Sequence, residues 1–234
     1  MEKTRAEKLN IYGDILNMDI ETQHSILAES YERLADYIHD NNISQLVGEG
    51  VSASPFTRII KRAYKQRYGK EARPLNVVNL GLYANYIKHK SGNVPEAEEL
   101  RNKLKINSKN TLILSETISS GISIRAVKRF IKQLKIPVKT AGLSCDEPGH
   151  VDFDVGLSKY GFDVPTYTGR GDYLYDYSRV DPSHPNRMVG AAKTQIHWKD
   201  FETLRPSIKP EYYPEYRAQL NVLINAVNLV KRKR

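Results

Sequence analysis

Short apolar runs alternate with amphipathic helix patterns along the first two thirds of the chain. The expected strands are the apolar runs at Ile43–Val47, Leu75–Leu80, Leu112–Leu114 and Val138–Ser144. Apolar residues at helical spacing predict one helix over Glu21–Ile38 and others after the first and third runs. Alternation of this kind is typical of a parallel sheet covered by helices on both faces. The sequence therefore predicts an α/β fold with a mainly parallel sheet.

The last third of the chain has a different composition. Tyrosine, glycine, aspartate and proline are frequent over Tyr160–Arg187, and a helix pattern returns over Glu215–Val230. We expect an α/β core with an N-terminal helix over residues 1–160, and a tyrosine-rich segment with a terminal helix over 161–234. The apolar side of the terminal helix has two candidate partners, the core or a second subunit, so a homodimer stays open.

A loop of small residues follows the third apolar run. It reads Ser119-Ser120-Gly121-Ile122-Ser123, and an amphipathic helix comes directly after it. Its hydroxyl groups, the backbone N–H groups around Gly121 and the first N–H groups of the helix can all donate to one anion. We favour a phosphate-binding loop. The alternative is an ordinary helix N-cap, where serine is also preferred.

One acidic residue, Glu116, ends the same apolar run. Ligands of open α/β sheets bind beyond the carboxyl ends of the strands. A carboxylate at that place can accept hydrogen bonds from both hydroxyls of a ribose. The alternative is a solvated acid at a strand end. Glu116 and the serine-rich loop together predict a sugar-phosphate ligand.

Residues Leu112–Ser123 resemble the ribose-phosphate signature of phosphoribosyltransferases. In that family an apolar strand leads into two adjacent acids and then into a Thr/Ser-Gly loop that holds the 5′-phosphate. The register without gaps puts the two acids at Ser115 and Glu116, so serine replaces the first of them. Ser119 stands where some purine-type members carry a catalytic acid. The order of expected elements over roughly residues 20–160 is also similar to the family core.

The resemblance implies a phosphoribosyltransferase-like fold with a C-terminal extension or hood near the base. It implies that Ser119–Ser123 bind the 5′-phosphate and that Glu116 is the catalytic carboxylate that holds the ribose hydroxyls. It also implies Mg²⁺, bound mainly through the substrate, where it neutralises charge on the leaving group.

A second loop, Gly48–Ser54, follows the first apolar run. It resembles the family loop that grips pyrophosphate through backbone N–H groups, here those of Gly50, Val51 and Ser52. Glycine and small residues suit that task because the backbone must come close to the ligand. A plain strand-to-helix turn is the alternative, since such a turn also favours glycine.

Three functions follow from the resemblance. The leading one is transfer of phosphoribose, from phosphoribosyl pyrophosphate (PRPP) or a nucleotide, to or from a nitrogenous base. The second is a catalytically inactive regulator of the same fold that binds nucleotide or PRPP and, through its basic surface, nucleic acid. The third is a related hydrolase or phosphorylase acting on a nucleotide.

Length and composition favour a cytoplasmic protein with one domain and additions. The chain has 234 residues, of which 40% are hydrophobic, and no window approaches the roughly 20 apolar residues of a membrane span. Its start, MEKTRAEKLN, lacks the apolar centre of a signal peptide. Its single cysteine, Cys145, cannot form an internal disulfide, and we expect a packing role for it.

The net charge is +9, and the basic residues are not spread evenly. They gather on the helices after the two loops and at the C-terminus, at Arg58, Lys61, Arg62, Lys65, Arg67 and Lys70, at Arg125, Lys128, Arg129, Lys132 and Lys135, and at Lys231, Arg232, Lys233 and Arg234. Solvated outer faces account for most of them. Nucleic acid is a minority hypothesis, since no helix-turn-helix pattern or zinc-ligand spacing supports it.

Overall fold

The computed structural model describes residues 18–50, 53–80, 84, 87, 98–99, 101–102, 104–107, 109–118, 120–145, 148–157, 175–176, 207–208 and 221–233. At 54–55, 116–117, 148, 175–176 and 207–208 it describes the backbone alone. Of the predicted second part of the chain, residues 161–174, 177–206, 209–220 and 234 lie outside these ranges, so the division at residue 160 stays a prediction.

Five parallel strands form the central sheet. They are β1 (Gln45–Gly48), β2 (Asn76–Asn79), β3 (Thr111–Ile118), β4 (Val138–Cys145) and β5 (Phe153–Asp154). Their order across the sheet is β2-β1-β3-β4-β5, and every neighbouring pair is parallel. The predicted α/β fold with a parallel sheet is therefore confirmed. A separate antiparallel pair joins β6 (Tyr175–Asp176) to β7 (Ser207–Ile208).

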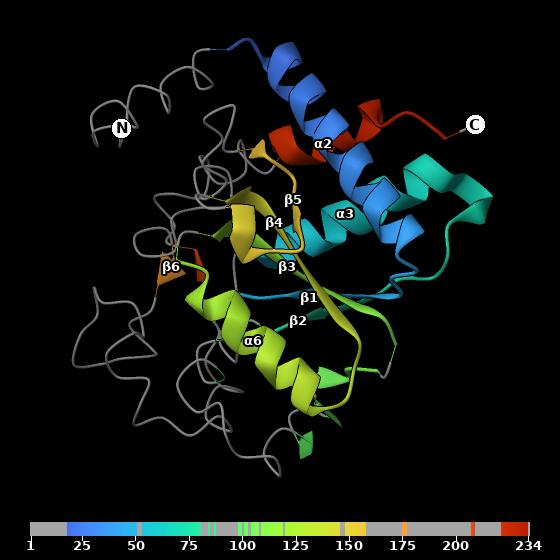
Figure 1. Cartoon of the computed structure of the whole chain (residues 1–234). Coiled ribbons are helices and arrows are strands. Elements are labelled where there is room, and N and C mark those ends of the chain that lie inside the picture. The colour runs from blue at the N-terminus through green and yellow to red at the C-terminus, as the bar shows by residue number, and fades with distance from the viewer. Residues whose placement is uncertain are drawn as a thin grey trace.

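Helices cover both faces of the sheet. α2 (Ile20–Asp40) and α3 (Ala53–Tyr68) lie on one face, and α6 (Ile122–Gln133) lies on the other (Figure 1). Alternate residues of β3 pack in different clusters, because successive side chains of a strand point to opposite faces of the sheet. Leu112 and Leu114 belong to the cluster beneath α2 and α3, whereas Ile113 packs in the cluster beneath α6.

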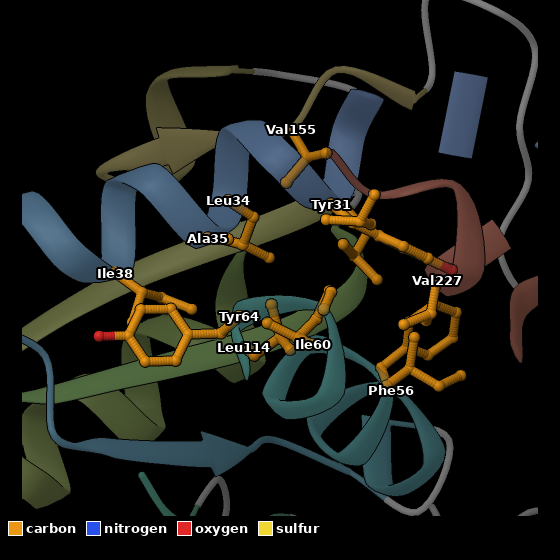
Figure 2. Close-up of a cluster of buried hydrophobic side chains, with 14 of the residues drawn as sticks. Tyr31, Leu34, Ala35, Ile38, Phe56, Ile60, Tyr64, Leu114, Val155 and Val227 are labelled. Atoms are coloured by element: carbon orange, nitrogen blue, oxygen red, sulfur yellow. The ribbon is translucent and has the colours of Figure 1, made fainter. Parts of the chain in front are cut away.

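The larger of these clusters joins α2 and α3 to the C-terminal segment (Figure 2). Tyr31 and Leu34 of α2 and Phe56 of α3 are fully buried in it. Residues 221–226 are helical and lead into the 3-10 turn η6 (Val227–Leu229), whose Val227 reaches the same cluster. Burial of this apolar surface fixes the C-terminal segment on α2 and α3.

Several predicted element boundaries need correction. The first strand starts at Gln45 rather than Ile43, and the second spans Asn76–Asn79 rather than Leu75–Leu80. Ile43 and Leu75 are buried all the same, because apolar residues beside a strand also pack in the core. α3 begins at Ala53, inside the loop that was predicted to run to Ser54. The fourth predicted strand is confirmed, with one extra residue at its end.

No helix in the part of the chain that the structure describes combines the length and the apolar character needed to cross a lipid bilayer. Cys145 is buried, 3% exposed, at the end of β4, as its expected packing role requires.

An ion-pair network holds the C-terminal segment against α2 and α3. The Arg67 guanidinium donates to both carboxylate oxygens of Asp36, at 2.9 and 2.7 Å, and to Glu32 at 3.1 Å. It also donates to the carbonyl of Lys231 at 3.0 Å, and the N–H of Lys233 donates to the carbonyl of Arg67 at 2.8 Å. The Arg67 hydrogen bonds lower the pKa of Asp36 from 3.8 to about 2, and the Tyr68 hydroxyl assists.

Asp36→Asn should lower the free energy of unfolding at pH 7 by about 1 kcal/mol. A pKa depression of this size corresponds to roughly 2 kcal/mol, and we reduce that figure because the carboxylate is partly exposed. The depressed pKa means that the stabilisation is complete above about pH 4 and disappears as the pH falls through about 2.

Urea unfolding between pH 7 and pH 3 measures this effect. The difference in urea midpoint between wild type and Asp36→Asn should be constant above pH 4 and should become smaller below it. Glu98→Gln is the matched control, because Glu98 pairs with Arg101 at 3.1 Å on the surface and its side chain is 51% exposed. A gap that widens in acid would contradict the assignment.

Candidate functional site

The strand order reverses direction between β1 and β3. The chain passes from β1 to β2 on one side and then crosses to β3 on the other side of β1. In open parallel sheets, ligands bind beyond the carboxyl ends of the strands at such a topological switch point. The loops after β1 and β3 both start there, and they are the two loops that the sequence singled out. Strand pairing therefore brings the two predicted parts of one site to neighbouring strands.

β3 extends past the end of β1 at the switch point. The last paired residues of the two strands are Gly48 and Leu114, and the N–H of Glu49 donates to the carbonyl of Leu114 at 3.0 Å. Beyond Leu114, the described pairing of β3 is with β4 alone. The edge of β3 that carries residues 115–118 therefore has no β1 strand beside it.

Glu116 lies on this extension of β3. The prediction that it ends the strand is wrong, since β3 continues to Ile118, where Thr117 and Ile118 pair with Ser144 and Cys145. Its backbone is described and its side chain is not, so its role as the ribose-binding carboxylate stays a prediction. Ser115, which stands at the position of the first acid in the phosphoribosyltransferase signature, is 5% exposed.

The serine-rich loop is shorter than predicted. α6 starts at Ile122, so Ile122 and Ser123 are in its first turn, and Ser119 lies outside the described residues. Gly121 is the N-cap, with φ 64° and ψ 5°, and no side chain caps the helix. This differs from the serine N-cap that was the alternative interpretation.

The start of α6 presents backbone donors that have no partner within the helix. The first helical hydrogen bond runs from the N–H of Arg125 to the carbonyl of Gly121, so the N–H groups of Ile122, Ser123 and Ile124 have no partner within the helix. No acidic residue lies in the first turn to neutralise them. The helix dipole adds partial positive charge at the same place. Ser120 is exposed and Ser123 half-buried, so their hydroxyls are accessible beside these donors.

Two basic side chains that the sequence did not assign to the site lie against Gly121. A Cβ atom placed on Gly121 would come within 2.8 Å of the Arg125 guanidinium and 2.9 Å of the His150 ring. Arg125 also donates to the carbonyl of Ser120 at 2.9 Å. Helical spacing puts Arg125 one turn after Gly121 and could have indicated it. No local pattern indicates His150, which comes from the turn η2 (Pro148–His150) after β4.

The two glycines of the first loop serve different purposes. A Cβ on Gly48 would lie 2.6 Å from the Asn79 side-chain oxygen and 3.1 Å from a Thr57 methyl group, and the Thr57 hydroxyl donates to that oxygen at 2.8 Å. Close packing therefore explains Gly48. A Cβ on Gly50 would meet nothing within 4 Å, so no packing within the described structure requires glycine there. Val51 and Ser52 lie outside the described residues.

A basic groove continues from this site along α6. It has a volume of about 360 Å³ and is lined by Ile122, Arg125, Lys128, Arg129 and Lys132. Lys128 is paired with Asp152 at 2.8 Å, which leaves Arg125, Arg129 and Lys132 to set a positive potential. An anion approaching the start of α6 is attracted from this side as well.

No model of a known protein family matches the chain, and no curated protein sequence matches it. Function is therefore inferred from the strand order and from the residues around the switch point.

Proposed function

We propose that this chain is a phosphoribosyltransferase-like protein that binds a phosphorylated ribose between the loops after β1 and β3. Its ligand is PRPP or a nucleotide 5′-phosphate, and it transfers phosphoribose to or from a nitrogenous base. One observation carries the proposal: the loops that resemble the pyrophosphate and 5′-phosphate loops follow the two adjacent strands of the switch point.

Each end of the ligand has a defined place in this proposal. The 5′-phosphate accepts hydrogen bonds from the N–H groups at the start of α6 and from the hydroxyls of Ser119, Ser120 and Ser123, while the absence of a Cβ on Gly121 lets Arg125 and His150 lie close to the loop. Pyrophosphate meets the backbone of Gly50, Val51 and Ser52. In this proposal Glu116 of β3 lies between the two anion sites, and its carboxylate holds the ribose hydroxyls.

The chain's contribution to transfer is positioning and charge stabilisation. The transition state of phosphoribosyl transfer has oxocarbenium character at the sugar, so the enzyme must hold phosphate, ribose and leaving pyrophosphate together. Mg²⁺ prefers oxygen ligands, and the phosphate and hydroxyl oxygens of the ligand itself would supply most of them. When bound, Mg²⁺ neutralises charge on the leaving pyrophosphate.

Isothermal titration calorimetry tests the proposal. PRPP should bind with measurable heat, more tightly with Mg²⁺ than without it, and ribose 5-phosphate should compete with PRPP. Incubation of the PRPP complex with a panel of purine and pyrimidine bases should then release pyrophosphate with one of them. Absence of both heat and a thermal shift with PRPP would overturn the proposal.

Gly50→Ala should lower the affinity for PRPP about tenfold, or about 1.4 kcal/mol, with no change in thermal stability. The added methyl group meets no described protein atom, but it obstructs the approach of pyrophosphate to the backbone. Affinity for ribose 5-phosphate, which lacks pyrophosphate, should be unchanged. Gly48→Ala is the contrasting variant, since its methyl group crowds Asn79 and should lower stability instead. An equal loss of affinity for PRPP and ribose 5-phosphate in Gly50→Ala would reject the pyrophosphate role.

A second candidate function is a binding protein of the same fold that senses PRPP or nucleotide without turnover. Ser115 favours it, because a buried hydroxyl stands where the signature of active enzymes has its first acid. The two candidates differ in one measurement: a sensor binds PRPP in calorimetry and releases no pyrophosphate with any base of the panel.

A further inference from the structure

A second basic groove lies between the end of α3 and the C-terminal segment, which we call the α3–tail groove. Its volume is about 550 Å³, and it is lined by Arg62, Lys65, Gln66, Gly69, Lys70, Val227, Asn228 and Arg232. The C-terminal segment covers the same side of the molecule as α3 (Figure 1). Four cationic side chains and two amides therefore face one hollow.

No described residue neutralises the four cations of this groove. In the described structure, none of Arg62, Lys65, Lys70 and Arg232 makes an ion pair, and all four residues are exposed. The carboxylates of Glu32 and Asp36 on the neighbouring α2 are engaged by Arg67 and Lys233. Positive charge gathered around a hollow attracts a polyanion.

The tail holds its part of the groove in a fixed position. The N–H of Lys231 donates to Glu32 at 2.7 Å and the N–H of Lys233 donates to the Arg67 carbonyl at 2.8 Å, so the backbone is held on both sides of Arg232. The Lys233 ammonium lies 3.5 Å from Asp36 and over the Tyr68 ring. Arg232, between these two anchored residues, is the one that lines the groove.

The α3–tail groove lies far from the switch point. α3 starts just after the carboxyl end of β1 and is 16 residues long, about 24 Å at 1.5 Å per residue. The groove is at its far end, beside the turn η1 (Gly69–Glu71) that leads into β2. The sugar-phosphate site and this groove are therefore separate.

We propose that the α3–tail groove binds the phosphate backbone of nucleic acid, without preference for base sequence. Its four cations, two on α3, one on η1 and one on the tail, can each contact one phosphate of a nucleic-acid strand. Gln66 and Asn228 add amide donors suited to phosphate and sugar oxygens. A lipid surface is disfavoured because the cations line a hollow instead of a plane, and Leu229 is the one large exposed apolar side chain beside it in the described structure.

Fluorescence anisotropy with a mixed-sequence 20-nucleotide single strand, titrated at several salt concentrations, tests this proposal. Four phosphate contacts predict a slope of log K against log salt of about −3. Arg62→Gln/Lys65→Gln should weaken binding about tenfold at low salt and reduce the slope by about 1.4. Both positions are exposed, so the fold is retained, which the thermal midpoint verifies.

Lys105→Gln/Lys109→Gln, before β3, is the matched control, because both residues are exposed, neither lines either basic groove, and the change leaves the same net charge, +9 minus two, or +7. It should bind the strand within about twofold of wild type. An equal loss in both double variants, or no salt-dependent binding by wild type, would overturn the proposal. So would binding to vesicles of phosphatidylserine that Arg62→Gln/Lys65→Gln weakens while nucleic-acid binding is unaffected.

Discussion

Gly121→Val should weaken the binding of ribose 5-phosphate at least about 100-fold, or about 2.7 kcal/mol. Gly121 has φ 64°, in the left-handed region that β-branched residues avoid. Its Cβ would also come within 3 Å of the Arg125 guanidinium and the His150 ring. The loop must move to relieve both conflicts, and the N–H groups at the start of α6 then no longer point toward one phosphate. Each charge-assisted hydrogen bond lost in this way costs about 1.5–3 kcal/mol.

Gly69→Val separates backbone strain from loss of the site. Gly69 has φ 56°, almost the same conformation, and a Cβ there meets nothing within 4 Å. It lies at the end of α3, far from the start of α6. Both valine variants should lose about 1–2 kcal/mol of stability from the left-handed backbone, but only Gly121→Val should lose ribose 5-phosphate in calorimetry. Equal affinities in the two variants would show that this loop does not hold the phosphate.

Leu114→Ala should lower the free energy of unfolding by about 3–5 kcal/mol. Leu114 is fully buried in the centre of the sheet, in the cluster that joins β3 to α2, α3 and the C-terminal segment (Figure 2). Truncation removes apolar contacts and leaves a cavity between layers that cannot collapse onto it. A loss of this size lowers the thermal midpoint by roughly 10 °C in a chain of this length.

Leu229→Ala provides the same chemical change at the surface. Leu229 is 50% exposed in η6, so its truncation should cost less than about 1 kcal/mol. Chemical denaturation of both variants at one pH compares them directly. Similar losses in the two variants would contradict the placement of Leu114 in the core.

The fold was largely predictable because its signals are local. Apolar runs of strand length and helical spacing of apolar residues located α2, α6 and the four longer strands. β5 was missed, since Phe153–Asp154 is only two residues long and forms through pairing with β4 rather than through its own sequence. The extension of β3 past Leu114 was missed for a related reason. Pairing with β4 keeps Ser115–Ile118 extended although the apolar run has ended.

The candidate site was predictable in outline only. Small residues after an apolar run indicate an anion loop, and the strand order places the two loops together. The sequence could not distinguish Gly48 from Gly50. Packing against Asn79 and Thr57 requires glycine at position 48, whereas a Cβ at position 50 would meet no described atom. Only neighbours distant in sequence make this difference. His150 was missed for the same reason, because it belongs to η2, a turn distant in sequence from the loop. Arg67 and Arg62 look alike along the chain, yet one holds the tail and the other lines an unneutralised groove.

A crystal structure of the protein with ribose 5-phosphate and Mg²⁺ tests the central claim most directly. The phosphate should lie at the start of α6, within hydrogen-bond distance of the N–H groups of Ile122 and Ser123, with the ribose toward β3 and Glu116. A phosphate bound only in the α3–tail groove, or a start of α6 that stays without phosphate at saturating ligand, would contradict the claim.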